Sequence, residues 1–155
     1  MGAEIIPVDD QQGAIRPTGA GQWEQKVYFA SGFTQYRPYM VANTAAAATS
    51  PAAIAAATEA DAVYHVCVPQ GATTTTAGWY WAVIQGVCQA LVDGTTDVAN
   101  GGFLEVINAG TAFILDHATA PTVNAMAIAR AAQATNAATE TEVYIMGGRV
   151  PVAAS

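Results

Sequence analysis

The sequence predicts an all-β protein: a small β-barrel, β-tulip or sandwich with an extended N-terminal arm and at most one short Ala-rich helix. Turn residues recur about every ten residues, and the segments between them are rich in β-branched and aromatic side chains. Residues 79–115 show this most clearly, because the turns Asp93-Gly94, Asn100-Gly101-Gly102 and Asn108-Ala109-Gly110 divide them into three or four short strands.

The chain divides into three parts by composition. Residues 1–22 contain Gly and Pro without a sustained period, which predicts an extended arm that orders against a partner. Residues 23–148 form the predicted β domain, interrupted by an Ala/Thr-rich insertion at 43–60. Within this insertion, Ser50 and Pro51 are suited to begin a short helix over the following alanines. Residues 149–155 are a short tail.

Several strands are predicted from alternation and turn placement. Residues 62–68 form a strand that is apolar on both faces, residues 103–107 and 111–115 form a hairpin, and residues 125–130 and 141–146 form the last two strands. Between them, the strand at 83–92 has one small apolar face that is expected to pack tightly. Its other face carries Gln85 and Gln89, so these two residues are the candidates for an interface between subunits.

The charge content restricts the possible partners. Charged residues make up 11% of the chain, against about 25% in typical soluble domains, and Lys occurs once. A surface with so few charges favours an assembling, structural protein. The net charge of −7 and the scattered basic residues disfavour nucleic acid and anionic membranes as partners.

Aromatic residues are dense between positions 23 and 39. They either cover one end of the core or form a docking surface, because aromatic side chains are enriched at interface centres. The candidates for this contact are Trp23, Tyr28, Phe33, Tyr36 and Tyr39.

The few reactive side chains lack the spacing of a catalytic or metal site. A zinc site could use the four side chains of His65, Cys67, Cys88 and His117. It is disfavoured because the sequence has no local ligand pair, such as CxxC, to hold the metal. A Cys88–His117–Asp116 triad is disfavoured because Asp116 adjoins His117 in sequence. Because the start of the chain lacks a signal peptide, we expect a reducing compartment and free thiols, although a Cys67–Cys88 disulfide is geometrically possible. We therefore expect no catalytic residue, cofactor or metal, and a protein that is not an enzyme.

The second half of the chain resembles the head-decoration (capsid cement) proteins of tailed bacteriophages. The resemblance lies in "GVCQALVDGTTDVANGGFLEVINAGTAFIL" and "AMAIARAAQATNAATETEVYIMGG", and covers residues 79–148. It implies a structural protein on the outer surface of an icosahedral head, made in the host cytoplasm. The implied partners are the major capsid protein and other copies of the chain, often in a homotrimer.

Parts of the sequence are compatible with two other functions. A carbohydrate-binding or host-attachment module would use Trp79, Tyr80 and Trp81 as a stacking platform, although alternation places neighbouring residues on opposite faces. A small enzyme would depend on Cys88 or His117.

Overall fold

The computed structural model describes residues 14–42, 53–54, 64–106, 111–115 and 125–147. These residues form strands and no helix, which confirms the all-β prediction. The strands are β1 (Ile15–Pro17), β2 (Trp23–Phe29), β3 (Tyr39–Ala42), β4 (Ala53–Ile54), β5 (Tyr64–Cys67), β6 (Gly78–Asp93), β7 (Phe103–Glu105), β8 (Ile114–Leu115), β9 (Ala127–Ala129) and β10 (Ala138–Ile145).

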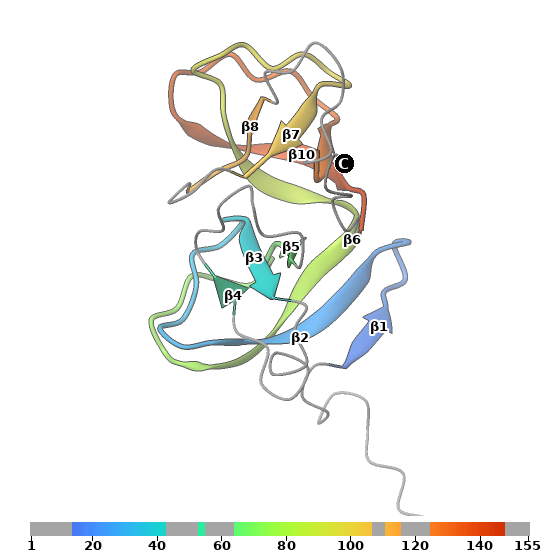
Figure 1. The fold of residues 1–155 in the computed structure, drawn as a ribbon, viewed down its shortest axis with the longest axis vertical. Coiled ribbons are helices and arrows are strands. Elements are labelled where there is room, and N and C mark those ends of the chain that lie inside the picture. Colours follow the sequence, from blue (N-terminus) through green and yellow to red (C-terminus); the bar gives the residue numbers. More distant parts are fainter. Residues whose placement is uncertain (1–13, 43–52, 55–63, 107–110, 116–124, 148–155) are drawn as a thin grey trace, which may run out of the picture.

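The strands form two sheets. One has seven strands in the order β1-β2-β6-β10-β9-β7-β8, and the other has three in the order β4-β3-β5. Figure 1 shows β1–β5 in the lower part of the molecule and β7, β8 and β10 in the upper part, with β6 passing between them. The large sheet begins at β1 and ends at β8, so the described strands form an open sheet rather than the closed barrel that we considered. Within the described residues, β1 pairs with β2 and β8 with β7, and no pairing joins these two end strands.

Strand β6 organises the large sheet because it has different partners along its length. Its first half pairs with β2 and its second half, from Gly86, pairs with β10, antiparallel in both cases. The register skips Ile84 where the first half ends, which marks a β-bulge. Gly86 follows with a φ of 102°, and a Cβ atom there would lie 2.9 Å from the Cα atom of Gln22. Only glycine allows the backbone at Gln22 to approach this closely.

Two apolar clusters form the core. One lies between β2, the first half of β6 and the small sheet, and includes Val27, Phe29 and Ala82. The other lies mainly between the second half of β6 and β7–β10, and includes Leu104, Phe113, Val143 and Ile145 among its buried residues. As predicted, the small apolar face of the 83–92 strand is buried at Cys88, Ala90 and Val92.

The small sheet contributes to both clusters. Neighbouring residues of β3 face opposite ways, so Met40 belongs to one cluster and Val41 to the other. On the adjacent β5, Val66 and Cys67 divide in the same way. The prediction of a strand near 62–68 with two apolar faces is therefore confirmed.

Part of the predicted arm belongs to the sheet. Residues 15–17 form β1, which pairs with β2 from Ile15 opposite Gln25 to Pro17 opposite Trp23. The turn between them is closed by Thr18 N donating to Gln22 O, and Arg16 forms an ion pair with Glu24. These extended residues belong to the sheet because the edge of β2 offers backbone partners that composition does not reveal. Residues 1–13 lie outside the described residues.

The predicted Ala-rich helix does not extend over Ala53 and Ile54. These two residues form β4, in which Ile54 pairs with Met40 and Ala53 pairs with Val41 of β3. Tertiary pairing overrides the helix propensity of alanine at this position. The remainder of the predicted helix and the tail at 149–155 lie outside the described residues.

The strands predicted near the end of the chain are present. Leu104 pairs with Leu115, and Glu105 with Ile114, which confirms the predicted hairpin. Strand β9 pairs with β10, and β10 begins at Ala138, three residues before the predicted start.

Candidate functional site

Exposed large hydrophobic side chains occur at two places in the described structure. Ile15 is 52% exposed and Trp23 is 42% exposed, and both lie on the β1–β2 pair. Phe103 is 36% exposed and Tyr144 is 38% exposed, on β7 and β10. Ile15 and Phe103 lie on β1 and β7, toward opposite ends of the strand order, whereas Trp23 and Tyr144 lie on β2 and β10, the two strands that flank β6. One sheet thus carries two groups of exposed apolar side chains.

The first surface, which we call the β1–β2 end, brings together one residue from each of two predicted contact sets. Trp23, a candidate for partner contact, lies directly opposite Gln85, a candidate for subunit contact. Both side chains are exposed, and the Gln85 side chain lies beside Gly147. Gln89 is farther along β6, half-buried and opposite Glu142. The two glutamines therefore share a partly solvated face, although they do not have the same neighbours.

The other aromatic candidates have different environments. Phe33 and Tyr39 are each 6% exposed and pack against Phe29, with ring centroids 5.3 Å and 5.1 Å away. They are core residues in the described structure, in agreement with the alternative that these aromatic residues cover one end of the core. Their burial follows from the loop after β2, which folds back over the core. Tyr28 is half-buried, with its ring 5.5 Å from that of Trp79.

The backbone of Tyr36 forms a hydrogen bond with β6. It has a φ of 63°, a left-handed conformation that is uncommon outside glycine, and its carbonyl accepts a hydrogen bond from Leu91 N at 2.8 Å. Its side chain is half-buried. Trp23 and Tyr28 are thus the accessible aromatic candidates on β2.

The second surface follows the register across four strands. Val87 on β6 lies opposite Tyr144 on β10, Tyr144 lies opposite Ile128 on β9, and Ile128 lies opposite Phe103 on β7. We call these four residues the Phe103–Tyr144 row. We did not predict it. Alternation in β10 contains a signal for it, because Tyr144 has the same parity as Glu140 and Glu142 and so belongs to the solvated face.

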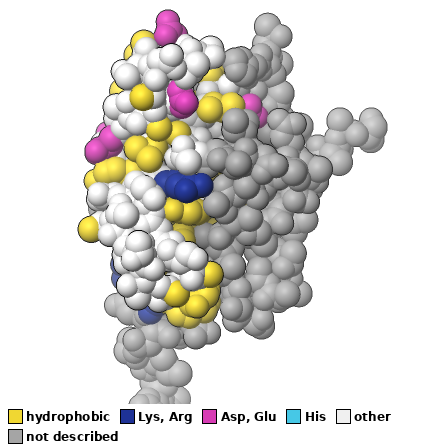
Figure 2. Space-filling view, turned by 90° about the vertical axis from the view of Figure 1, so that its left-hand side faces the viewer, with side chains coloured by type: hydrophobic (Ala, Val, Ile, Leu, Met, Phe, Trp, Pro, Cys, Tyr) yellow, Lys and Arg dark blue, Asp and Glu magenta, His cyan; other side chains and the backbone are white. Residues whose placement is uncertain are grey.

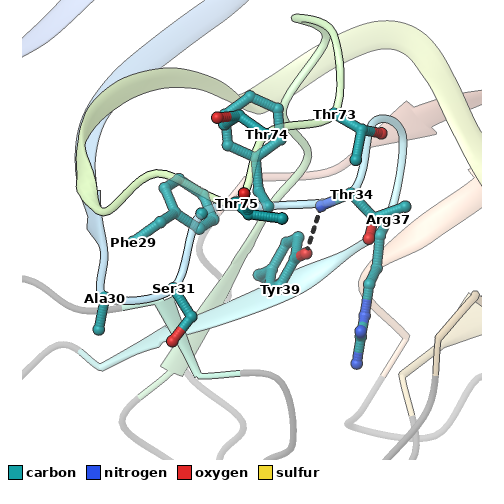
Figure 3. Close-up of a pocket in the computed structure, with 11 residues that line it drawn as sticks. Phe29, Ala30, Ser31, Thr34, Arg37, Tyr39, Thr73, Thr74 and Thr75 are labelled. Carbon is teal, nitrogen blue, oxygen red and sulfur yellow. Dashed lines mark hydrogen bonds between the residues drawn. The ribbon is translucent and has the colours of Figure 1, made fainter.

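A pocket lies near the loop after β2, with a volume of about 370 Å³. Its lining residues are Phe29, Ala30, Ser31, Gly32, Phe33, Thr34, Arg37, Tyr39, Thr73, Thr74 and Thr75 (Figure 3). The lining combines aromatic rings with hydroxyl groups and includes no carboxylate and no histidine.

The walls of this pocket are held by hydrogen bonds. Phe33 and Thr74 exchange two backbone hydrogen bonds of 2.9 Å and 3.0 Å. Thr34 N donates to Tyr39 Oη at 2.8 Å, as drawn in Figure 3. A Cβ atom on Gly32 would lie 2.1 Å from Thr74 O, so the two loops meet only because residue 32 is glycine. The Arg37 guanidinium carbon lies over the Tyr39 ring, 5.2 Å from its centroid.

The described thiols and imidazole are enclosed in the core. Cys67 is fully buried and Cys88 is 5% exposed, and both are free. Burial raises the pKa of both thiols, that of Cys88 to about 12, so the reactive thiolate is scarce at neutral pH. Burial lowers the pKa of His65, and its Nε2 lies 2.7 Å from Gln25 Oε1. Among the described residues, no three His, Cys, Asp or Glu side chains are placed to hold a metal ion. His117 and Asp116 lie outside this part of the chain.

The three residues of the considered sugar platform do not form a common surface. Tyr80 packs against the buried Phe33, with a centroid separation of 5.0 Å. The ring of Trp81 has the Arg16 guanidinium carbon 3.8 Å from its centroid, and Lys26 Nζ is 5.8 Å away. Trp79 contacts Tyr28. Intramolecular contacts therefore engage all three side chains.

The surface has few charges. Figure 2 shows a face where hydrophobic side chains lie in small groups among backbone and other uncharged side chains, with a few acidic and basic side chains between them. Within the described ranges, there is no helix long and apolar enough to cross a membrane. Comparison with known family models, curated proteins and solved structures finds no match to this chain.

Proposed function

We propose that this protein is a structural decoration protein that binds the outer surface of an icosahedral phage head, between subunits of the major capsid protein. The observation that supports this proposal most directly is the exposure of large hydrophobic side chains on two pairs of strands of one sheet, Ile15 and Trp23 on β1 and β2 and Phe103 and Tyr144 on β7 and β10. Two apolar surfaces on one hydrogen-bonded sheet can contact two neighbouring subunits at a fixed distance. The low charge content and the resemblance of residues 79–148 to decoration proteins agree with this function.

The β1–β2 end supplies the proposed first contact. Trp23 is an amphipathic aromatic residue, the type that is enriched at the centres of interfaces. The ladder between β2 and β6 orders its backbone before binding, so the entropic cost of association is reduced. Ile15 is exposed on the neighbouring strand.

The test is binding to expanded heads assembled from the major capsid protein encoded nearest to this gene. Labelled protein is mixed with the heads and sedimented, and cryo-electron microscopy then locates it. We expect saturable binding at fixed lattice positions, together with a higher temperature of head disruption. An absence of saturable binding to heads would exclude the proposed function. A glycan array tests the carbohydrate-binding alternative, which no contact described above favours.

The oligomeric state is a separate question. The resemblance implies a homotrimer, and light scattering of the free protein tests it. A trimer in solution would place Gln85 or Gln89 among the candidates for its interface, which Gln85→Glu and Gln89→Glu would then disrupt by introducing charge.

A further inference from the structure

We infer that the Phe103–Tyr144 row is a docking surface for a protein segment whose apolar side chains are surrounded by Lys or Arg. The inference rests on the proposed function, because the partner considered is the major capsid protein. It adds to that function the location of a second contact and the chemistry of the surface that it contacts.

The row is continuous because each member lies opposite the next in the hydrogen-bonded register. Adjacent strands are about 4.8 Å apart, so four strands give a row roughly 14 Å long. Phe103 and Tyr144 are each more than a third exposed. Ile128, which lies between them, and Val87, at the end of the row, are half-buried. The backbone beneath the row is ordered by pairing, so binding does not have to order it.

The opposite face of the same strands packs in the core. Leu104, Ala127, Val143 and Ile145, which alternate with the members of the row, are fully buried. Substitution of Phe103 or Tyr144 therefore changes the solvated face and leaves the core side chains in place.

Charge distinguishes between the possible occupants of the row. Glu105 follows Phe103 on the same face of β7, and Glu140 and Glu142 precede Tyr144 on the same face of β10. Arg130, a basic residue beside the row, forms a 3.0 Å ion pair with Glu142. On β10, Glu140 and Glu142 outnumber this one guanidinium among the described residues, which makes the face acidic on a chain whose net charge is −7. A second copy packed face to face would place carboxylates against carboxylates, whereas a partner with basic residues around an apolar centre is complementary.

The experiment compares variants in the head-binding assay. Phe103→Thr combined with Tyr144→Thr removes both exposed rings while retaining residues that favour strands. We expect the dissociation constant for heads to rise at least tenfold, as for loss of central aromatic residues in other interfaces. Tyr144→Phe keeps the ring and removes only the hydroxyl, so it should bind within about twofold of the unchanged chain. Glu140→Gln should weaken binding severalfold at low salt and less at high salt.

The matched control combines Thr75→Ala with Thr76→Ala, two exposed side chains that belong to neither apolar surface. It should bind as the unchanged chain does. Circular dichroism and the urea midpoint verify that every variant is folded. If the unchanged chain binds heads and the Phe103→Thr/Tyr144→Thr variant binds equally well, the inference is wrong while the proposed function stands. If the unchanged chain self-associates in solution and only this variant is monomeric, the occupant is a second copy, which also overturns the inference.

Discussion

The side-chain amide of Gln70 pairs with the backbone of Gln89 as a neighbouring strand would. Gln70 Nε2 donates to Gln89 O at 2.9 Å, and Gln89 N donates to Gln70 Oε1 at 3.3 Å. The pairing occurs in the second half of β6, beyond the end of the β2 ladder. Gln22 Nε2 donates to Val87 O nearby, and Leu91 N donates to Tyr36 O. Side chains and loops thus satisfy the backbone groups that β2 leaves open.

We expect Gln70→Ala to lower the free energy of unfolding by about 1–3 kcal/mol, because it leaves the amide and carbonyl of Gln89 without this partner. Gln89→Ala is the matched control. The pairing uses only the backbone of Gln89, so this change should cost less than about 0.5 kcal/mol. Urea denaturation of both variants measures the difference. Equal losses in the two variants would show that the Gln70 pairing contributes little.

A second prediction separates backbone strain from crowding at glycine. Gly86 combines a φ of 102° with the close approach of Gln22, whereas Gly101 has a φ of 87° and no atom within 4 Å of an added Cβ. Gly19 has neither a positive φ nor a neighbour at that distance. We expect Gly86→Ala to cost about 2–4 kcal/mol and Gly101→Ala about 1 kcal/mol. Gly19→Ala should be nearly neutral.

Thermal or urea unfolding of the three glycine variants gives their order. A Gly86→Ala variant as stable as Gly101→Ala would mean that the turn at Gln22 moves away without cost. The contact between this turn and β6 would then not help to determine where the β2 ladder ends.

The sequence contains enough information to predict the strands, and less to predict their pairing. Alternation and turns located β6, the β7–β8 hairpin and β10, because periodicity is a local property. Strands β1 and β4 were missed because they are short and lack a clear pattern. They are strands because β2 and β3 present open backbone edges, which is a tertiary property.

The candidate site was predicted in part for the same reason. Trp23 and Gln85 were identified from residue type, yet their adjacency depends on the β2–β6 register. Phe33 and Tyr39 have the same aromatic character as Trp23, and only the path of the loop after β2 buries them. The Phe103–Tyr144 row joins residues of four different strands, so no local pattern contains the whole row, although alternation in β10 places Tyr144 on the solvated face.

A third prediction concerns pH. Burial lowers the pKa of His65 from its ordinary value of 6.5, so the unfolded chain binds this proton more readily than the folded chain does. The contribution of neutral His65 is complete above pH 6.5 and is lost as the pH falls toward the lower folded pKa. We therefore expect the free energy of unfolding to decrease from pH 7 to pH 5.5, by at most about 1.4 kcal/mol per pH unit for one proton.

The control is His65→Gln, which places an amide near Gln25 and does not titrate. Urea midpoints at pH 7, 6.5, 6 and 5.5 should fall for the unchanged chain and stay nearly level for this variant. Parallel curves for the two proteins would assign the pH dependence to other groups.

The last prediction concerns the N-terminal residues. Deletion of residues 1–22 removes β1, the Arg16–Glu24 ion pair and the contact of Gln22 with Val87, so we expect it to destabilise the fold by about 2–4 kcal/mol. Deletion of residues 1–13 keeps all of these contacts and should change stability by less than about 0.5 kcal/mol. The shorter deletion is therefore the one that tests the arm in head binding. Residues 1–13 contain Ile5, Ile6 and Val8 among polar residues, which is a composition suited to ordering on a partner surface.

We expect the chain without residues 1–13 to bind heads more weakly while its urea midpoint is unchanged. Ile15→Thr combined with Trp23→Thr should weaken binding further, because it removes the exposed apolar groups of the β1–β2 end. If deletion of residues 1–13 leaves the affinity for heads unaltered, the arm is not an anchor. The contact then lies on the sheet, at the β1–β2 end and the Phe103–Tyr144 row, and only the substitutions there should weaken it.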